Sequence, residues 1–255
     1  MPVVLKIFIW FSLFNLNFWL CFASWGLGKV TIFDAASTKK TPIYLKVLTK
    51  GRLFAEGGKL VDVYVDDKKV KQILTGSDGY GYLKYTPLQP GLTRIEARSD
   101  GDSDSGVILV VTKSDRVILI DVQSGIKESQ FSGSARANSR KTIETLSQKY
   151  KIIYLDTFFG SGVSRDWLQD EDFIESATLK WQGAGMLKSL KAKGINLFAI
   201  IGSAELISQS AKYVEHRYSF EETKDGETIT NWKEIPELLQ KTSSQEPSTA
   251  TEKQK

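Results

Sequence analysis

Polar side chains follow two apolar segments that have the character of buried strands, and their types suggest phosphoryl chemistry. Arg116–Ile120 delivers Asp121 to a Ser/Gly turn, and Lys151–Leu155 is followed closely by Thr157. Open α/β sheets bind ligands in the crevice beyond the carboxyl ends of their parallel strands. An aspartate nucleophile there would need a second acid two residues further on, to hold Mg²⁺ and to protonate the leaving group. That position is Gln123, so the pattern predicts a site that has lost its activity or has been put to another use.

Residues 116–239 resemble the haloacid dehalogenase-like (HAD) superfamily, especially its lipin and phosphatidate-phosphatase-like branch. The first motif of that family is Asp-x-Asp-x-Thr after a strand, and Asp121-Val-Gln-Ser-Gly stands in the matching place. The second motif is a Ser or Thr at the end of the next strand, where this chain has Thr157. The Thr-Arg-x-Trp-Leu segment of the lipin-like branch is similar to the run from Ser164 to Leu168.

The two remaining motifs of the family are matched less completely. The lysine of the third motif corresponds to Lys188, with Lys191 as the alternative. The acidic fourth motif corresponds to Gly202-Ser203-Ala204-Glu205, in which Ser203 replaces the leading acid. The resemblance implies a catalytic set that would supply the nucleophile, a hydrogen-bond donor and a charge clamp: Asp121, Thr157 and Lys188. It also implies a set that would bind ligand at the crevice: Gln123, Ser203 and Glu205.

The replacement of two acids weakens both metal binding and general acid catalysis, which contributes typically about 10²–10⁴-fold. Asp121 and Glu205 are the remaining candidates for metal ligands. We therefore expect a non-catalytic, degenerate domain that binds a ligand or partner and holds no cofactor. The alternatives are a phosphatase with an atypical Mg²⁺ site, acting on a phosphomonoester or phosphatidate, and a structural protein without a small-molecule site. In the structural alternative Asp121 only caps a turn. A von Willebrand A-type metal site is disfavoured, because Asp121-Val-Gln lacks the first Ser of its Asp-x-Ser-x-Ser pattern.

The first residues form a distinct segment of the chain. Lys6 precedes the apolar run Ile7–Phe22, and Cys21-Phe22-Ala23 offers small residues before Ser24. This order is typical of a secretory signal peptide spanning residues 1–23. A retained anchor over residues 7–25 is the alternative. We predict a secreted or periplasmic protein with a protein or envelope partner, which would meet the membrane only through an uncleaved N-terminal segment.

Composition narrows the classes of partner and chemistry. The chain has 255 residues and a formal net charge of +4, with Lys and Glu dispersed. Because no basic stripe or RNA-binding aromatic motif is present, we expect no nucleic-acid partner. Cys21 is the only cysteine, so the mature chain would hold no disulfide and no Cys-ligated zinc. His216 is the only histidine and lies far from any Gly-x-Ser-x-Gly elbow, so we interpret it as a surface residue.

Residues 41–113 carry short alternating segments separated by Gly, Asp and Pro turns, which predicts an all-β sandwich. One hairpin turn is expected at Asp66-Asp67. The runs Thr75–Tyr80 and Pro90–Ala97 resemble bacterial Ig-like modules of extracellular proteins. The aspartates of this part match no calcium loop and are interpreted as turn formers.

Residues 114–240 alternate between strands and helices, which predicts a doubly wound, Rossmann-like parallel sheet. The expected strands after the first two are a short one in ATLKW, Asn196–Ile201 and an edge strand Arg217–Phe220. The expected helices are Ala135–Tyr150, Met186–Lys193 with Gly194 as its stop, Glu205–Tyr213, and Trp232–Leu239 begun by Asn231. Residues 241–255 lack large apolar side chains and are expected to be a disordered tail.

Overall fold

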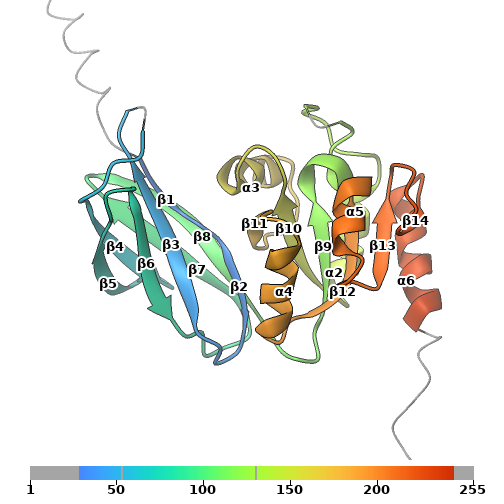
Figure 1. The fold of residues 1–255 in the computed structure, drawn as a ribbon, viewed down its shortest axis with the longest axis horizontal. Helices are drawn as coiled ribbons and strands as arrows, with labels where there is room; N and C mark the ends of the chain where they lie inside the picture. The colour runs from blue at the N-terminus through green and yellow to red at the C-terminus, as the bar shows by residue number, and fades with distance from the viewer. Residues whose placement is uncertain (1–28, 53, 130, 244–255) are drawn as a thin grey trace, which may run out of the picture. The chain divides into compact units, whose positions relative to one another are not determined.

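The computed structural model describes residues 29–52, 54–129 and 131–243. It combines β-sandwich-like sheets with an α/β region (Figure 1), so the broad fold class predicted from the sequence is confirmed. The predicted signal peptide and most of the predicted tail lie outside the described residues. Among the helices within the described ranges, none is long and apolar enough to cross a membrane.

The β-rich part consists of two sheets. The first has three strands in the order β1 (Lys29–Ile32), β3 (Ile43–Lys50) and β6 (Tyr80–Tyr85). The second has five, in the order β2 (Ala35–Thr38), β8 (Asp102–Val111), β7 (Gly91–Ser99), β4 (Leu60–Val65) and β5 (Lys68–Leu74). Burial alternates along β4, as the apolar-polar alternation of its sequence predicts. Within the described residues, β-structure is already present at Lys29, earlier than the expected start at Thr41.

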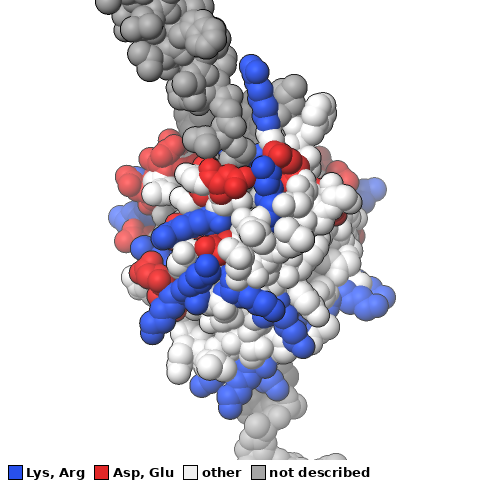
Figure 2. All heavy atoms as spheres, turned by 90° about the vertical axis from the view of Figure 1, so that its left-hand side faces the viewer, with Lys and Arg blue, Asp and Glu red and all other residues white. Residues whose placement is uncertain are grey.

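The hairpin between β4 and β5 forms where the sequence predicts it. Asp66 and Asp67 have φ of 46° and 62°, the left-handed pair that a two-residue hairpin turn requires. β5 is an edge strand and is almost wholly exposed. Lys and Arg side chains project from the face that includes this strand (Figure 2). Charge on an exposed edge opposes pairing with the edge of another sheet.

The α/β region is built on six strands that all run parallel to their neighbours. Their order is β11 (Thr178–Lys180), β10 (Lys151–Asp156), β9 (Arg116–Asp121), β12 (Asn196–Gly202), β13 (His216–Ser219) and β14 (Glu227–Thr228). The chain adds β10 and β11 on one side of β9 and then returns to add β12 on the other. The strand order therefore reverses at β9, and the crevice beyond the ends of β9 and β12 is the expected place for a site.

Helices cover both faces of this sheet because its strands are apolar on both sides. Ile118 and Ile120 of β9 pack on one face with residues of α2 (Ser139–Ser147), α3 (Ser161–Asp170) and α6 (Ile235–Ser243). Val117 and Leu119 pack on the other face with residues of α4 (Ala184–Ala192) and α5 (Ala204–Ser210). Residues of β2 and β8 join this second core: Ala36, Val107, Leu109 and Val111.

Several predicted elements need correction. The helix expected over Ala135–Tyr150 is the shorter α2, which begins only at Ser139 because Asn138 has a left-handed φ of 67°. The helix α3 was not expected at all, since Gly160, Gly162 and the serines around them are poor helix formers. The predicted edge strand Arg217–Phe220 is β13, which β14 covers. Gly194 ends α4 with φ of +83° and Asn231 caps the final helical segment, both as predicted.

Cα packing divides the chain into two compact units. Among the described residues, one unit takes residues 29–32, 46–83 and 95–105, and the other takes 33–45, 84–94 and 106–243. The border crosses strands of the β-rich part. The second unit therefore holds the α/β region together with β2 and the second half of β8. Separate folding of residues 41–113 and 114–240 stays a prediction.

Candidate functional site

The ends of β9 and β10 bring four polar side chains together. Asp121 is the last residue of β9, and the chain then turns through a π-helix, Val122–Ile126, instead of the expected Ser/Gly turn. Asp121 caps this turn by accepting from the backbone N–H of Gln123 at 3.1 Å. A π-turn is wider than an α-turn and is often found at functional sites. Here it directs Gln123 toward the end of β10.

The Gln123 side chain is buried, and both of its polar atoms are hydrogen-bonded. Its Nε2 donates to Asp156 Oδ1 at 3.1 Å and to Ser164 Oγ at 2.9 Å. Its Oε1 accepts from the backbone N–H of Thr157 at 2.9 Å. Thr157 Oγ1 lies 3.1 Å from the same oxygen, but its single hydrogen points to the nearer Asp121 Oδ1 at 2.9 Å. Both donor hydrogens and one acceptor position of Gln123 are therefore used within the protein.

Asp121 is also enclosed, being 1% exposed. It accepts from Thr157 Oγ1 at 2.9 Å and from the hydroxyl of Ser124. No lysine or arginine pairs with it within the described part of the chain. Burial raises the pKa of Asp121, and the hydrogen bonds from Ser124, Thr157 and the Gln123 backbone offset only part of that effect. A carboxyl group that is costly to ionise is a poor nucleophile and a poor metal ligand.

Asp156 completes the network and was missed as a site residue in the sequence. It is 1% exposed and accepts from Ser164 Oγ at 2.8 Å and from the backbone N–H of Gly160 at 2.7 Å. The Gly160 bond fixes the loop that leads into α3, and α3 supplies Ser164. The sequence did offer one signal for Asp156 as a site residue, which is its position at a strand end beside Thr157. Nothing in the sequence indicated that Gln123 would reach it.

Gly202 at the end of β12 lies close to Asp121. A Cβ on Gly202 would lie 2.5 Å from Leu206 Cδ2 and 3.0 Å from Asp121 Cβ. Both distances are shorter than ordinary van der Waals contact, so the glycine is needed for β12 to approach Asp121.

The other predicted site residues lie outside this network. Ser203 caps α5 by accepting from the backbone N–H of Leu206 at 3.2 Å. Glu205 is exposed and accepts from Gln209, and Lys188 is exposed on α4. Within residues 29–243, apart from positions 53 and 130, no group of three or more His, Cys, Asp or Glu side chains could hold a metal ion. His216 lies on β13 with its ring 4.7 Å from that of Phe198.

An exposed aromatic cluster borders the closed network. Phe158 and Phe159 follow Thr157 directly, and Phe131 comes from the loop after the π-helix. Phe131, Phe158 and Phe159 are 76%, 55% and 40% exposed, and their rings meet edge to face at 4.9–6.1 Å. The Lys127 ammonium lies 5.5 Å from the Phe159 ring centre and 4.4 Å from that of Trp167. Burial lowers the pKa of Lys127. We call Phe131, Phe158 and Phe159 the aromatic rim.

The raised pKa of Asp121 predicts how the Asp121→Asn variant depends on pH. The pKa of Asp121 in the folded protein lies above the ordinary value of 3.8. Between pH 3.8 and the folded-state pKa, the folded protein therefore binds more protons than the unfolded chain does. Stability therefore falls as pH rises through this window. The asparagine variant lacks the titration, so its free energy of unfolding should improve relative to wild type as pH rises above about 4. Urea unfolding over a pH series measures this, with exposed Asp166→Asn as control. A difference that stays constant with pH would contradict it.

Comparisons with known proteins give no family for this chain. No family model and no curated protein sequence matches it. Among solved structures, the CARDB domain of a Pyrococcus furiosus protein, in complex with di-metal ions, is 19% identical with a TM-score of 0.29; the match covers 34% of this chain and 90% of that one. The fibronectin(III)-like modules of Clostridium thermocellum CbhA are 16% identical with a TM-score of 0.25, over 32% and 97%. The tandem Ig repeats of Dlar are 12% identical with a TM-score of 0.24, over 44% and 73%.

The resemblance to the HAD superfamily and its lipin-like branch is therefore wrong. No family model supports it, and the structural neighbours are β-sandwich domains. The motif matches have a simpler physical origin. Asp, Ser, Thr and Gly at the ends of parallel strands are the residues that cap helices and form turns. Asp121 and Ser203 both serve as such caps here, and Lys188 faces solvent.

Proposed function

We propose that this protein is a secreted or envelope-associated interaction protein whose α/β region binds a partner without catalysis. The observation that carries the proposal is the hydrogen bonding of the buried Gln123 side chain to Asp156, Ser164 and the backbone of Thr157. A buried hydrogen-bonded network makes a region rigid and favours one arrangement. Neither donor hydrogen of Gln123 is left to bind a reacting substrate.

The aromatic rim is the surface that we assign to the partner. Exposed aromatic side chains are enriched in protein interfaces, and Val163, 58% exposed, adds apolar area from the start of α3. Lys127 contacts the Phe159 ring but is only 8% exposed. Segments 128–134 and 157–163 contain no Lys or Arg, whereas Glu128 is exposed. Membrane surfaces select for cationic residues beside inserted aromatics. The rim therefore favours a protein partner over a lipid surface.

The β-rich part supports the same function. Its short strands with tight turns fit an Ig-like module, a type of domain used for display and binding outside cells. The charged edge strand β5 would keep such a module from pairing with other sheets. Export through the N-terminal segment belongs to this proposal, and N-terminal sequencing of the native protein beginning at Ser24 would support it.

Absence of catalysis is tested with the purified mature protein. Millimolar Mg²⁺ should not raise the Tm beyond an ionic-strength control, because ligands stabilise only the state they bind. Hydrolysis of a phosphomonoester and of phosphatidate should be equal for wild type and Asp121→Asn. A saturable rise in Tm with Mg²⁺ that Asp121→Asn removes, together with hydrolysis that the same variant abolishes, would overturn the proposal in favour of a phosphatase.

Partner binding is tested in the native cells with a photoreactive phenylalanine at position 158. We expect a discrete crosslinked protein from this position and none from the matched exposed position Lys212 of the same unit. Equal crosslinked products from both positions, or no product from position 158, would contradict partner binding at the aromatic rim. Either result would favour a purely structural protein. Adding Phe159→Ser to the protein that carries the photoreactive residue should lower the yield of crosslinked product, since it removes a neighbouring ring of the aromatic rim.

A further inference from the structure

The segments at the carboxyl edge of the parallel sheet are acidic on their exposed side. Because all six strands run parallel, the segments that follow them gather at one edge. These segments are 122–138, 157–160, 181–183, 203–205, 220–226 and 229–231. Their exposed acids are Glu128, Glu205, Glu221, Glu222 and Asp225, whereas Lys224 is the one fully exposed base that the structure describes there. This edge therefore presents a negative surface.

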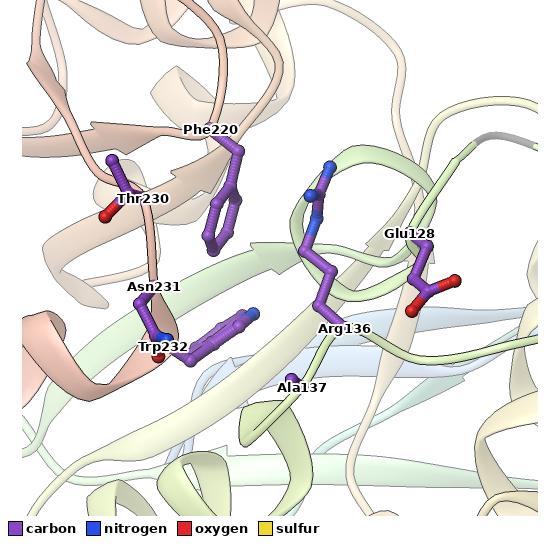
Figure 3. A pocket seen from close by; sticks show the side chains of 7 residues that line it. All are labelled: Glu128, Arg136, Ala137, Phe220, Thr230, Asn231 and Trp232. Atoms are coloured by element: carbon purple, nitrogen blue, oxygen red, sulfur yellow. The ribbon is translucent and has the colours of Figure 1, made fainter.

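Glu128 and Glu221 belong to loops that are far apart in the sequence, but both lie near Arg136. Burial lowers the pKa of Arg136, and the charges of Glu221 and Glu128 act in the opposite direction. Figure 3 shows Arg136 between Glu128 and Phe220, and its guanidinium lies 4.4 Å from the centre of the Phe220 ring. Arg136 Nη2 donates to the carbonyl of Ser124 at 3.2 Å. The arginine is therefore held against the protein, while the two carboxylates are exposed.

The negative surface continues to the first turn of α5. The backbone N–H of Ala204 donates to Glu221 Oε2 at 2.9 Å, which places Glu221 beside that turn. Glu205 is exposed on the same turn. We call Glu128, Glu205 and Glu221 the acidic band. Within the described ranges, none of the three forms an ion pair with a lysine or arginine. Their charges are therefore available to a partner.

The aromatic rim lies at the same edge of the sheet as the acidic band. Glu128 begins the loop that carries Phe131, and its backbone N–H donates to the carbonyl of Ser134 at 3.1 Å, which closes that loop. The Phe131 ring meets the ring of Phe158, from the loop after β10, at 5.8 Å. Exposed apolar rings and unpaired negative charge therefore occur together on one edge of the second unit.

We propose that the aromatic rim and the acidic band together dock a cationic segment of a partner protein, with an apolar face and flanking Lys or Arg side chains. This inference rests on the proposed function, because it gives the chemistry of the partner that the rim would bind. Exposed phenyl rings supply apolar contact area, and complementary charge steers association and suppresses wrong partners. The same carboxylates would repel an anionic segment or an anionic lipid surface.

The experiment is an NMR titration of the mature protein that follows the ring signals of labelled phenylalanine. The probes are three amphipathic peptides of equal length, built from Leu with Lys, Leu with Gln, or Leu with Glu. We expect saturable shifts of the rim signals with the Leu/Lys peptide, about tenfold weaker binding of Leu/Gln, and none of Leu/Glu. Affinity for Leu/Lys should fall as salt rises. No saturable shift with Leu/Lys, or equal affinity for Leu/Lys and Leu/Gln, would overturn the proposal.

Charge variants separate the acidic band from the total charge of the protein. Glu128→Gln combined with Glu221→Gln removes two charges and keeps an acceptor oxygen at each position. This double variant should weaken Leu/Lys binding by about threefold to tenfold. Glu144→Gln with Glu215→Gln, at exposed positions on α2 and before β13, is the matched control and should bind as wild type does. Equal affinity of the two double variants would refute the role of the acidic band.

Crosslinking in native cells separates this inference from the proposed function. A product from position 158 whose yield is unchanged by Glu128→Gln with Glu221→Gln would keep the partner and refute its cationic character. Loss of the product under all conditions would refute both. Binding of phosphatidylglycerol vesicles, or dimerisation of the protein alone that Phe158→Ser abolishes, would assign the surface to a lipid or to a second copy and overturn the inference.

Discussion

Replacing Asp34 by alanine should destabilise the folded chain by about 3–5 kcal/mol, the cost of breaking a buried, hydrogen-bonded ion pair. The Asp34 carboxylate accepts from the backbone N–H groups of Val107 at 2.9 Å and Thr178 at 2.8 Å. It also accepts from Arg165 Nη1 at 3.0 Å, and its side chain is 1% exposed. Alanine would leave the two backbone N–H groups without their acceptor and would remove the carboxylate that Arg165 contacts.

The contacts of Asp34 explain why its loss should affect the whole second unit. Val107 belongs to β8, Thr178 to β11 and Arg165 to α3, so one carboxylate joins three elements of this unit. Burial raises the pKa of Asp34 although Arg165 and both N–H groups act to lower it. Asn at this position keeps one acceptor oxygen and should cost less than Ala.

Urea unfolding of Asp34→Ala, Asp34→Asn and wild type at neutral pH measures this effect. Asp62→Ala is the control, because Asp62 makes an exposed pair with Lys69, and exposed pairs add little stability. If Asp34→Ala lost no more stability than Asp62→Ala, the three hydrogen bonds would not have the role described.

The second large effect is expected from Gln123→Glu, which changes the shape of the closed network very little. The new carboxylate would meet Asp156 Oδ1, which Gln123 Nε2 now approaches at 3.1 Å as a donor. Two buried carboxylates cannot both ionise at that separation without a cation. We expect a loss of about 3 kcal/mol or more at neutral pH, as for other uncompensated buried charges.

Acid should recover part of this loss, because the pKa of the carboxyl group introduced by Gln123→Glu would be raised in the folded state. A raised acid pKa means that stability is greatest at low pH and is lost as pH rises through the folded value. Urea unfolding between acidic and neutral pH tests both statements. Gln182→Glu, at an exposed loop position, is the matched control. Equal stability of Gln123→Glu and wild type at neutral pH would show that the amide is not bonded as we describe.

The elements that the sequence predicted best are those with strong local signals. The segments before Asp121 and Thr157 are apolar throughout and lack the alternation of apolar and polar residues that a half-exposed strand has. They therefore form parallel strands that are buried on both faces. The turn at Asp66-Asp67 and the helix stop at Gly194 follow from side chains that tolerate left-handed backbone. The helix α3 was missed because its N-terminal residues favour loops, and only packing of Leu168 in the core overrides that preference.

The sequence also placed Asp121, Gln123 and Thr157 at one edge of the sheet, since strand ends in a parallel sheet meet there. It could not decide what these residues do, because their types are equally suited to catalysis and to capping. The tertiary structure added Asp156 and Ser164, which accept both donor hydrogens of Gln123. The role of Asp34 had no local signal. Asp34 and Arg165 are hydrogen-bond partners 131 positions apart, and the packing of their elements brings them together. The periodicity of a segment predicts only whether that segment forms a helix or a strand.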